Sequence, residues 1–553
     1  MGISIHISIS HSVTKEEWTA VYLETLRLVE AFPFAERRKV SVRGIDTVCL
    51  IPTREREDQH GWNNEKIRTG WFADGDYESL CTAEEYYLPR DLITDDTYDP
   101  DAPDAMFGML PAYLPYEWKD PRFQSCYDLW GEKTQGEPYH MYLLAVACLI
   151  ESRLGRKACI YGDITKGQCR KAVEMANSYL DNKIDIPARC NPGTLLERVK
   201  SFPVSEQEML AIYICLYLGN KDALFGERLR NYFSEAAFEA YWADRFGSFQ
   251  VTMRGFNDAI KDYLLWGFSL EKLSGYVSFT DEEGNEYYND YVRKIMATKL
   301  YINEKDCRDI LKIDEDREEP YGVSRLFMQF TLSAAANRKV DRYIPLEEIR
   351  AALLSSIGDR CDVNQLIDDY LEEEATCQKS EKAETAFRSD EDCEKAAVHD
   401  ASAVLNHAME MKRKAWEEKR EQYKITEPED LPFYEMGDTI SPDLAEMVGE
   451  YFTFYRSIIK EDRFTELMND TPKARCKWLV YQNRNILLRD KDWDRIYGDI
   501  MDNPLSFERY YPMVRVKITE DSLIYLIRAI TINDDFYRYA FTLEEKYGKE
   551  VSQ

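Results

Sequence analysis

The sequence lacks any pair of cysteines at C-x-x-C spacing, although thirteen cysteines are scattered singly along the chain. This absence argues against a zinc ribbon and against a thioredoxin-like redox site. The odd number of cysteines, together with first residues that leave no room for a secretory leader, favours reduced and mostly buried thiols. We therefore expect a cytoplasmic protein without a disulfide framework.

Long apolar runs are also missing. The two longest uncharged runs, Met141–Ile150 and Met209–Leu218, have ten residues each, about half the length that a membrane-spanning helix needs. They predict buried helices. Met1-Gly2 would suit N-myristoylation, but His6 stands where that signal needs Ser or Thr. We expect a soluble chain with no membrane partner.

The common catalytic signatures are absent as well, since the sequence has no G-x-G-x-x-G, G-x-S-x-G, H-E-x-x-H or protein-kinase motif. Residues Gly162–Cys169 have the glycine spacing of a P-loop, but Gln168 and Cys169 replace the lysine and the hydroxyl that would bind phosphate and magnesium. The segment is better interpreted as a strand-to-helix turn capped by Thr165. Asp163, at the carboxyl end of the strand, remains a candidate catalytic residue. No motif requires a cofactor.

Acidic residues outnumber basic residues by 101 to 71, which gives a net charge of −30. An expected acidic loop, Asp74–Asp104, holds eleven acidic residues and one basic residue. A field of this sign repels nucleic-acid backbone and favours basic partners, or serves solubility alone. Five carboxylates of this loop are candidate contacts for a basic partner: Asp95, Asp96, Asp99, Asp101 and Asp104.

Three acids of the same segment, Asp74, Asp76 and Glu78, alternate along the chain. In an extended segment their carboxylates share one face, and three convergent oxygens suit Mg²⁺, Mn²⁺ or Ca²⁺. Ser79 stands where an EF-hand loop would need glycine. The hypothesis is a metal site, and the alternative is a solvated acidic loop.

The first strand offers a second candidate catalytic residue, His6. Residues 2–10 alternate polar and apolar side chains, as a half-buried strand does. Ser4 and Ser8 share the polar face with His6 at steps of about 7 Å, which is too long for a hydrogen bond without partners from elsewhere. A polar residue that faces solvent or lies under a helix is the alternative.

A basic island, 473–489, lies near the C-terminus and contains no acid. Cations beside aromatic rings suit single-stranded nucleic acid or a phosphate ligand. The acidic residues that follow can pair with the arginines, so an ordinary charged helix face is the alternative. The candidates are Lys473, Arg475, Lys477, Trp478, Tyr481, Arg484 and Arg489.

The patterns predict an α-rich multidomain protein. Residues 1–190 indicate an α/β domain, and residues 191–371 a mainly helical domain with one hairpin. Residues 372–430 have the composition of a charged linker with an exposed helical strut. Residues 431–553 indicate an α+β module, whose strand we expect at Met513–Ile518.

Several short motifs predict individual helix ends and turns more precisely than composition predicts the domain boundaries. Thr14 and Glu17 form a capping box before an apolar-striped helix. Tyr139–Leu154 predicts a buried central helix that ends at a glycine, and Arg43-Gly44-Ile45 predicts the turn of a hairpin.

The leading functional hypothesis is an interaction protein (a regulator, inhibitor or assembly component) that binds a macromolecule. The preferred partner is a protein, and basic proteins are among the candidates. Acidic and aromatic surfaces suit such a role. The alternatives are an enzyme that handles a metal or phosphate in the N-terminal domain, and nucleic-acid contact through residues 473–489.

Overall fold

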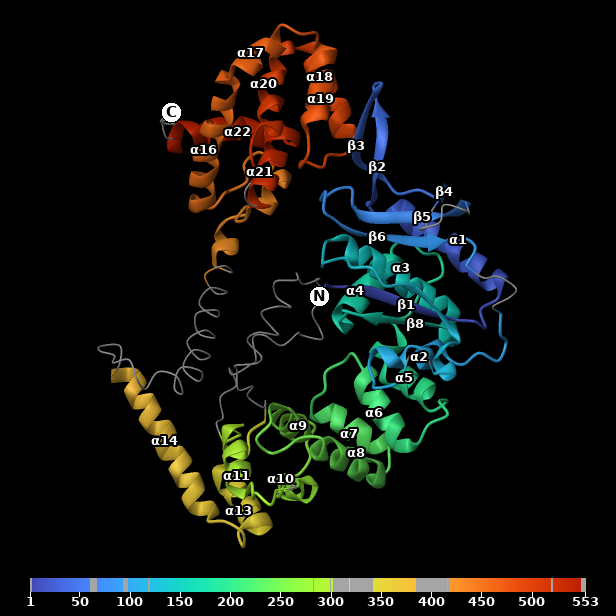
Figure 1. The fold of residues 1–553 in the computed structure, drawn as a ribbon, viewed down its shortest axis with the longest axis vertical. Coiled ribbons are helices and arrows are strands. Elements are labelled where there is room, and N and C mark those ends of the chain that lie inside the picture. Colours follow the sequence, from blue (N-terminus) through green and yellow to red (C-terminus); the bar gives the residue numbers. More distant parts are fainter. Residues whose placement is uncertain are drawn as a thin grey trace. The chain divides into compact units, whose positions relative to one another are not determined.

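The computed structural model describes residues 2–59, 67–92, 98–117, 120–281, 283–298, 300–301, 318, 342–383, 415, 418–518 and 521–548. These residues are mostly helical and include two β-sheets (Figure 1), which confirms the α-rich fold class. Their contacts divide the chain into two compact units. Unit 1 contains Met1–Ala31, Glu57–Gly70 and Leu88–Asn406, and unit 2 contains Phe32–Arg56, Trp71–Tyr87 and His407–Gln553. The four-part division expected from the sequence stays a prediction.

The three-stranded sheet of unit 1 has the expected first strand at its centre. β1 (Ile5–Ser10) lies between β7 (Cys126–Trp130) and β8 (Ala158–Gly162) and is antiparallel to both. The isoleucines of β1 are fully buried on one face, where α3 (Tyr139–Leu154) packs on β1 and β8 and also contacts α1 (Lys15–Ala31) (Figure 1). The alternating pattern of the first ten residues therefore predicted both the strand and its buried face correctly.

The helices of unit 1 begin and end where local signals place them. Thr14 N donates to Glu17 Oε2 at 2.8 Å, and Glu17 N donates to Thr14 Oγ1 at 3.2 Å, which is the predicted capping box. α3 has the predicted bounds and ends at Gly155, whose φ of +57° suits glycine. α4 (Lys166–Asn177) begins at the predicted cap, Thr165.

The middle of unit 1 is helical, as predicted, and its core is rich in aromatic rings. The predicted hairpin is short: Thr280 and Glu286 form an antiparallel bridge, Tyr287 N donates to Phe279 O, and Asp281 N donates to Asn285 O. The helices are α2 (Ala105–Gly108), α5 (Pro192–Val199), α6 (Glu206–Leu216), α7 (Ala223–Tyr232), α8 (Glu235–Gly247), α9 (Arg254–Leu265), α10 (Leu270–Leu273), α11 (Tyr288–Ala297), α13 (Leu346–Ile357) and α14 (Val363–Ala383).

The second sheet has the strand order β3-β2-β5-β4, and β6 pairs with β5. Its strands are β2 (Phe34–Val42), β3 (Ile45–Pro52), β4 (Arg56–Gln59), β5 (Ile67–Asp76) and β6 (Thr82–Pro89). The predicted hairpin is confirmed, because β2 and β3 are antiparallel and Val42 pairs with Ile45. Arg43 and Gly44 form its two-residue turn with φ values of +48° and +77°, which fits a type I′ turn. The segment expected to be an acidic loop contains β6, so it is not one continuous loop.

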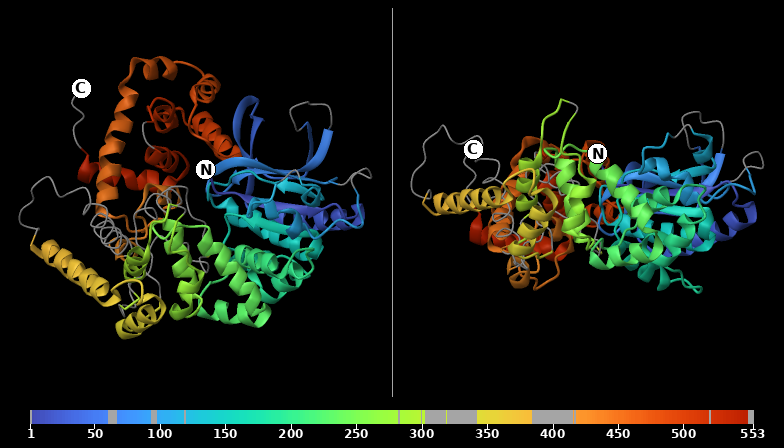
Figure 2. Two further views of the ribbon diagram at one scale, coloured as in Figure 1. Left: turned by 60° about the horizontal axis from the view of Figure 1, so that its bottom comes forward. Right: turned by 90° about the horizontal axis from the view of Figure 1, so that it is seen from below.

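The hairpin packs against the C-terminal helices of unit 2 (Figures 1 and 2). Val42, Ile45 and Cys49 belong to the same buried cluster as those helices. Strand residues from the first hundred positions therefore complete the core of the C-terminal module. Its helices are α16 (Pro442–Ser457), α17 (Asp462–Met468), α18 (Pro472–Gln482), α19 (Asp490–Asp502), α20 (Phe507–Tyr510), α21 (Asp521–Ile532) and α22 (Asp534–Tyr547).

The strand predicted at Met513–Ile518 is wrong. A 3-10 helix covers Tyr511–Val514, and both Arg515 N and Val516 N donate to Pro512 O. Met513 and Val516 are buried, and their spacing of three residues fits a helical turn rather than a strand.

Much of the predicted strut, residues 391–414, lies outside the described residues, whereas residues 418–422 are helical. Among the described residues, every helix is too short or too polar to cross a membrane.

Candidate functional site

Ser4 brings together the two candidate catalytic residues, His6 and Asp163. Ser4 Oγ lies 3.1 Å from His6 Nε2 and donates to Asp163 Oδ2 at 3.3 Å, while Ser4 N donates to the same oxygen at 2.9 Å. The expectation that neighbours on one strand are too far apart is therefore wrong here, because the long histidine side chain leans along the strand. The pairing of Ile5 with Gly162 brings Asp163 to this end of β1.

The His6 ring is held by the neighbouring strand. It stacks on Tyr161, its register partner on β8, with ring centroids 4.7 Å apart and an interplanar angle of 18°. Tyr161 donates to Asp128 Oδ1 at 2.9 Å. A Cβ at Gly162 would lie 3.1 Å from His6 Cδ2, so this glycine leaves room for the ring. No sequence pattern identifies Tyr161 or Asp128, because only the strand pairing brings them to His6.

A histidine beside a serine hydroxyl could activate that serine as a nucleophile, but the directions of the hydrogen bonds around Ser4 argue against this role. The serine hydroxyl has one proton, which it gives to Asp163. His6 Nε2 must then donate to Ser4 Oγ, whereas a general base would accept a proton from it. His6 Nδ1 is buried and has no hydrogen-bond partner in the described structure, so no carboxylate there orients the ring. The cluster is best explained as a tie between β1 and the loop after β8.

The three acids of the hypothetical metal site do not converge on one point, because each is in a different environment. Asp74 Oδ1 accepts a hydrogen bond from Arg37 N at 3.0 Å, and Asp76 Oδ1 accepts from Glu78 N at 2.7 Å and from Ser79 N at 2.8 Å. The Glu78 side chain is exposed. Within the described ranges, no group of three His, Cys, Asp or Glu residues could hold a metal ion. Asp74 and Asp76 thus support the sheet and its turn.

Asp74 carries a stability cost at neutral pH. Burial raises the pKa of its carboxyl to about 6, against the opposing effect of Arg37. A carboxyl with a raised pKa favours folding below its unfolded pKa of about 3.9, and this contribution is lost as the pH rises through 6. We expect Asp74→Asn to raise the free energy of unfolding by about 1–3 kcal/mol at pH 8 and to change it little near pH 4. Urea titrations at both pH values test this, and a gain that does not depend on pH would contradict it.

The five candidate acids for partner binding are in different environments. Asp95 and Asp96 lie outside the described residues, whereas Asp99 and Asp101 are exposed. Asp104 is buried, and its carboxylate is occupied internally. It therefore offers no free edge to a partner.

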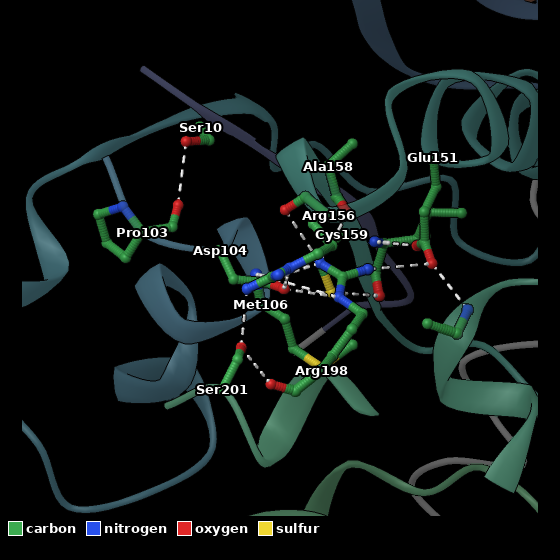
Figure 3. A network of polar contacts seen from close by, with 12 residues as sticks. Ser10, Pro103, Asp104, Met106, Glu151, Arg156, Ala158, Cys159, Arg198 and Ser201 are labelled. Atoms are coloured by element: carbon green, nitrogen blue, oxygen red, sulfur yellow. Dashed lines mark hydrogen bonds and ion pairs between the residues drawn. The ribbon is translucent and has the colours of Figure 1, made fainter. Parts of the chain in front are cut away.

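Figure 3 shows the network around Asp104. Arg198 Nε donates to both carboxylate oxygens, at 3.2 and 3.0 Å, and Arg156 Nε donates to one at 3.3 Å. Met106 N donates to Asp104 Oδ1 at 2.8 Å and so caps α2. On its other side, Arg198 lies 3.7 Å from the buried carboxylate of Glu151. The network joins α2, α3 and α5, so its role is structural.

The basic island is divided by the two faces of α18 and by the turn that follows it. Three of its seven candidates face inward. Arg475 is buried and donates to Met468 O at 3.4 Å, at the C-terminus of α17, a favourable place for a cation. Trp478 stacks on Tyr511, with ring centroids 5.2 Å apart. Arg489 Nη2 donates to Asp492 Oδ1 at 3.0 Å, so an acid just after the island does pair with one of its arginines, as the alternative allowed.

The other four candidates face outward and form one row, which we call the α18 strip: Lys473, Lys477, Tyr481 and Arg484. The first three are exposed and follow one another at intervals of four residues, so they lie on one face of the helix. The Tyr481 side chain is 69% exposed, and the Arg484 guanidinium lies 5.5 Å from the centroid of its ring. The island pattern predicted these residues, but only the helix face separates them from the inward-facing three.

The cations of the α18 strip differ from most others in unit 2. Arg43 pairs with Asp494 at 2.7 Å, and Arg495 pairs with Asp534 at 2.9 Å. Lys473, Lys477 and Arg484 form no ion pair with any residue that the structure describes. No carboxylate of the described residues therefore neutralises these three charges at ion-pair distance.

Comparison with known proteins finds no family model, no curated protein and no solved structure that matches this chain. Its function is therefore inferred from the exposure, contacts and charges of the described residues.

Proposed function

We propose that this chain is an interaction protein and that the α18 strip is a docking surface for an acidic partner. The observation that carries the proposal is the absence of ion pairs between the three exposed cations of the strip and any described residue. The chain has 30 more acidic than basic residues, so intramolecular partners for a cation are abundant. Three neighbouring cations that form no ion pair with a described residue keep a positive surface available for recognition.

Tyr481 strengthens the proposal because it adds contact area to the charges. Tyrosine and arginine are enriched among the residues that contribute most to binding between proteins, and Tyr481 and Arg484 lie side by side on the strip. The ring supplies apolar area, while the lysines steer an acidic partner toward it. We expect association to slow as the salt concentration rises, since exposed charges are then screened.

The basic partner expected from the sequence has less support. Asp74, Asp76 and Asp104 are buried and make internal contacts, so the acidic segment offers fewer free carboxylates than its composition implies. The enzyme alternative also has less support, because Asp163 accepts from Ser4 and the ring nitrogen His6 Nδ1 has no partner among the described residues.

Binding of an unstructured acidic peptide tests the proposal. A Glu-Gly repeat peptide with a neutral dye is titrated with the full chain at low salt, and fluorescence anisotropy reports binding. We expect Lys473→Glu/Lys477→Glu to weaken binding about tenfold, because each exposed charge contact contributes up to about 1 kcal/mol and the substitutions reverse two of them.

The matched control reverses two exposed lysines elsewhere, Lys200→Glu/Lys460→Glu, and so changes the net charge equally. This control should bind the peptide nearly as the unsubstituted chain does. Equal loss in both double variants would contradict the proposal, since net charge would then explain the binding.

A further inference from the structure

We infer that the segment bound at the α18 strip is an acidic α-helix. It presents two carboxylates one turn apart to Lys473 and Lys477, and an apolar side chain on its next turn to Tyr481. The inference rests on the proposed function and specifies the partner of that same surface.

The spacing of the strip is the first reason. Lys473, Lys477 and Tyr481 are four residues apart, which separates them by about 6 Å along the axis of α18. Carboxylates at positions i and i+4 of a partner helix have the same separation. Rows of side chains four residues apart on two helices also pack together in the commonest class of helix crossing. Both lysines can thus be paired at once.

The backbone of α18 is the second reason. The amides of a helix bond within the helix, and at the start of α18 the cap residue Thr471 accepts from Ala474 N through its Oγ1 at 3.2 Å. The exposed face of α18 can therefore contact a partner only through its side chains. An extended peptide gains affinity mainly from main-chain bonds to a sheet edge, which this face lacks. A partner helix satisfies its own backbone hydrogen bonds and therefore needs no main-chain bonds from α18.

The length of the strip argues against nucleic acid. Three cations can neutralise about three phosphates, which gives a salt slope of only about −2 for a single strand. A longer strand would continue past the strip toward Asp470, which is exposed just before α18 and forms no ion pair with a described residue, whereas Glu466 pairs with Arg463. Repulsion there opposes a polyanion, whereas a helix with two carboxylates is no longer than the strip.

Tyr481 defines the third contact. Arg484 covers part of its ring, yet the side chain remains 69% exposed. An apolar side chain packed on the free part of the ring would remove both surfaces from water. The partner is thus distinguished from other acidic helices by an apolar residue on the turn after its two carboxylates.

Two helical alanine-based peptides of identical composition test the inference with the full chain. One carries Glu at i and i+4 and Leu at i+8, and the other carries the same residues on different faces. We expect the first to bind about fivefold more tightly, because only it can pair both lysines. Lys473→Glu/Lys477→Glu should abolish this preference, and Lys200→Glu/Lys460→Glu should keep it. Tyr481→Ala should weaken the first peptide about threefold and leave the second unchanged.

The outcomes separate the inference from the proposed function. Equal binding of both peptides, lost in Lys473→Glu/Lys477→Glu, would overturn the helical partner while the docking surface stands. Displacement of the first peptide by oligo(dT) at equal concentration would overturn it in favour of nucleic acid. Failure of both helical peptides and of the Glu-Gly peptide would overturn the proposed function itself.

Discussion

Asp104→Ala should lower the free energy of unfolding by about 3–5 kcal/mol, because it removes the carboxylate that accepts hydrogen bonds from the buried guanidinium of Arg198. The two side chains are 2% and 4% exposed. Burial by itself would lower the pKa of Arg198, but Asp104 raises it above its ordinary value. The guanidinium therefore stays charged, and in the variant Glu151 is the carboxylate that remains near it.

The loss should extend beyond one ion pair. Arg198 Nη2 also donates to Ala158 O at 3.1 Å, at the start of β8 in the first sheet. Glu151 accepts from Ile160 N and from Ala188 N, each at 2.8 Å, and so ties α3 to β8 and to the turn before α5. A displaced Arg198 would disturb these contacts as well.

Urea-induced unfolding of the full chain, followed by circular dichroism, measures the effect. Asp104→Leu/Arg198→Met should recover part of the loss, because it removes the buried cation together with its carboxylate but also removes the contacts of Arg198 with Ala158 O and Glu151. Asp181→Ala, which breaks the exposed pair of Asp181 with Arg27, should change little. If the double variant is as unstable as Asp104→Ala, the ion pair is not the source of the loss.

Acidification from pH 7 to pH 4 should cost the protein about 3 kcal/mol of stability through His140 alone. The side chain of His140 is fully buried, its Nδ1 lies 2.7 Å from Thr134 Oγ1, and its Nε2 has no partner in the described structure. Burial lowers the pKa of this imidazole to about 4. A protonated ring there would be a charge without a counter-ion.

The sign follows from the two pKa values. An unfolded chain protonates this histidine below about 6.5, whereas the folded chain resists protonation until about pH 4. The contribution to stability is therefore complete above 6.5 and is lost as the pH falls through 4, a difference of about 2.5 pK units at about 1.4 kcal/mol each.

Urea titrations between pH 4 and pH 8 test this with His140→Gln, whose neutral amide does not titrate. The variant should lose about 3 kcal/mol less than the unsubstituted chain between pH 7 and pH 4. His11→Gln, at a half-buried histidine next to Tyr127, should keep most of the pH dependence. Parallel pH profiles for the unsubstituted chain and His140→Gln would contradict the assignment.

Features governed by neighbours in the sequence could be predicted closely. The capping box at Thr14, the bounds of α3 and the turn at Arg43 depend on backbone geometry within a few residues. The strand prediction for Met513–Ile518 was wrong although the signal is local. Its apolar pattern fits the period of a strand and also that of a helix, and Pro512 lies in the first turn of a 3-10 helix there.

Contacts between distant residues could not be predicted. Asp104 was assigned to a partner because its neighbours are acidic, yet Arg198, 94 positions away, pairs with it. Asp163 and Ser4 are 159 positions apart, and only strand pairing joins them. Such contacts leave no periodic signal, because each depends on one residue at each end.

The local elements, the excess of negative charge and the basic island follow from the amino-acid sequence alone. Those properties depend on composition and on near neighbours. Which charged side chains are exposed depends on the tertiary structure, because burial depends on which distant parts of the chain cover a side chain. The fold turned Asp104 and Arg475 inward and left Lys473 and Lys477 facing the solvent.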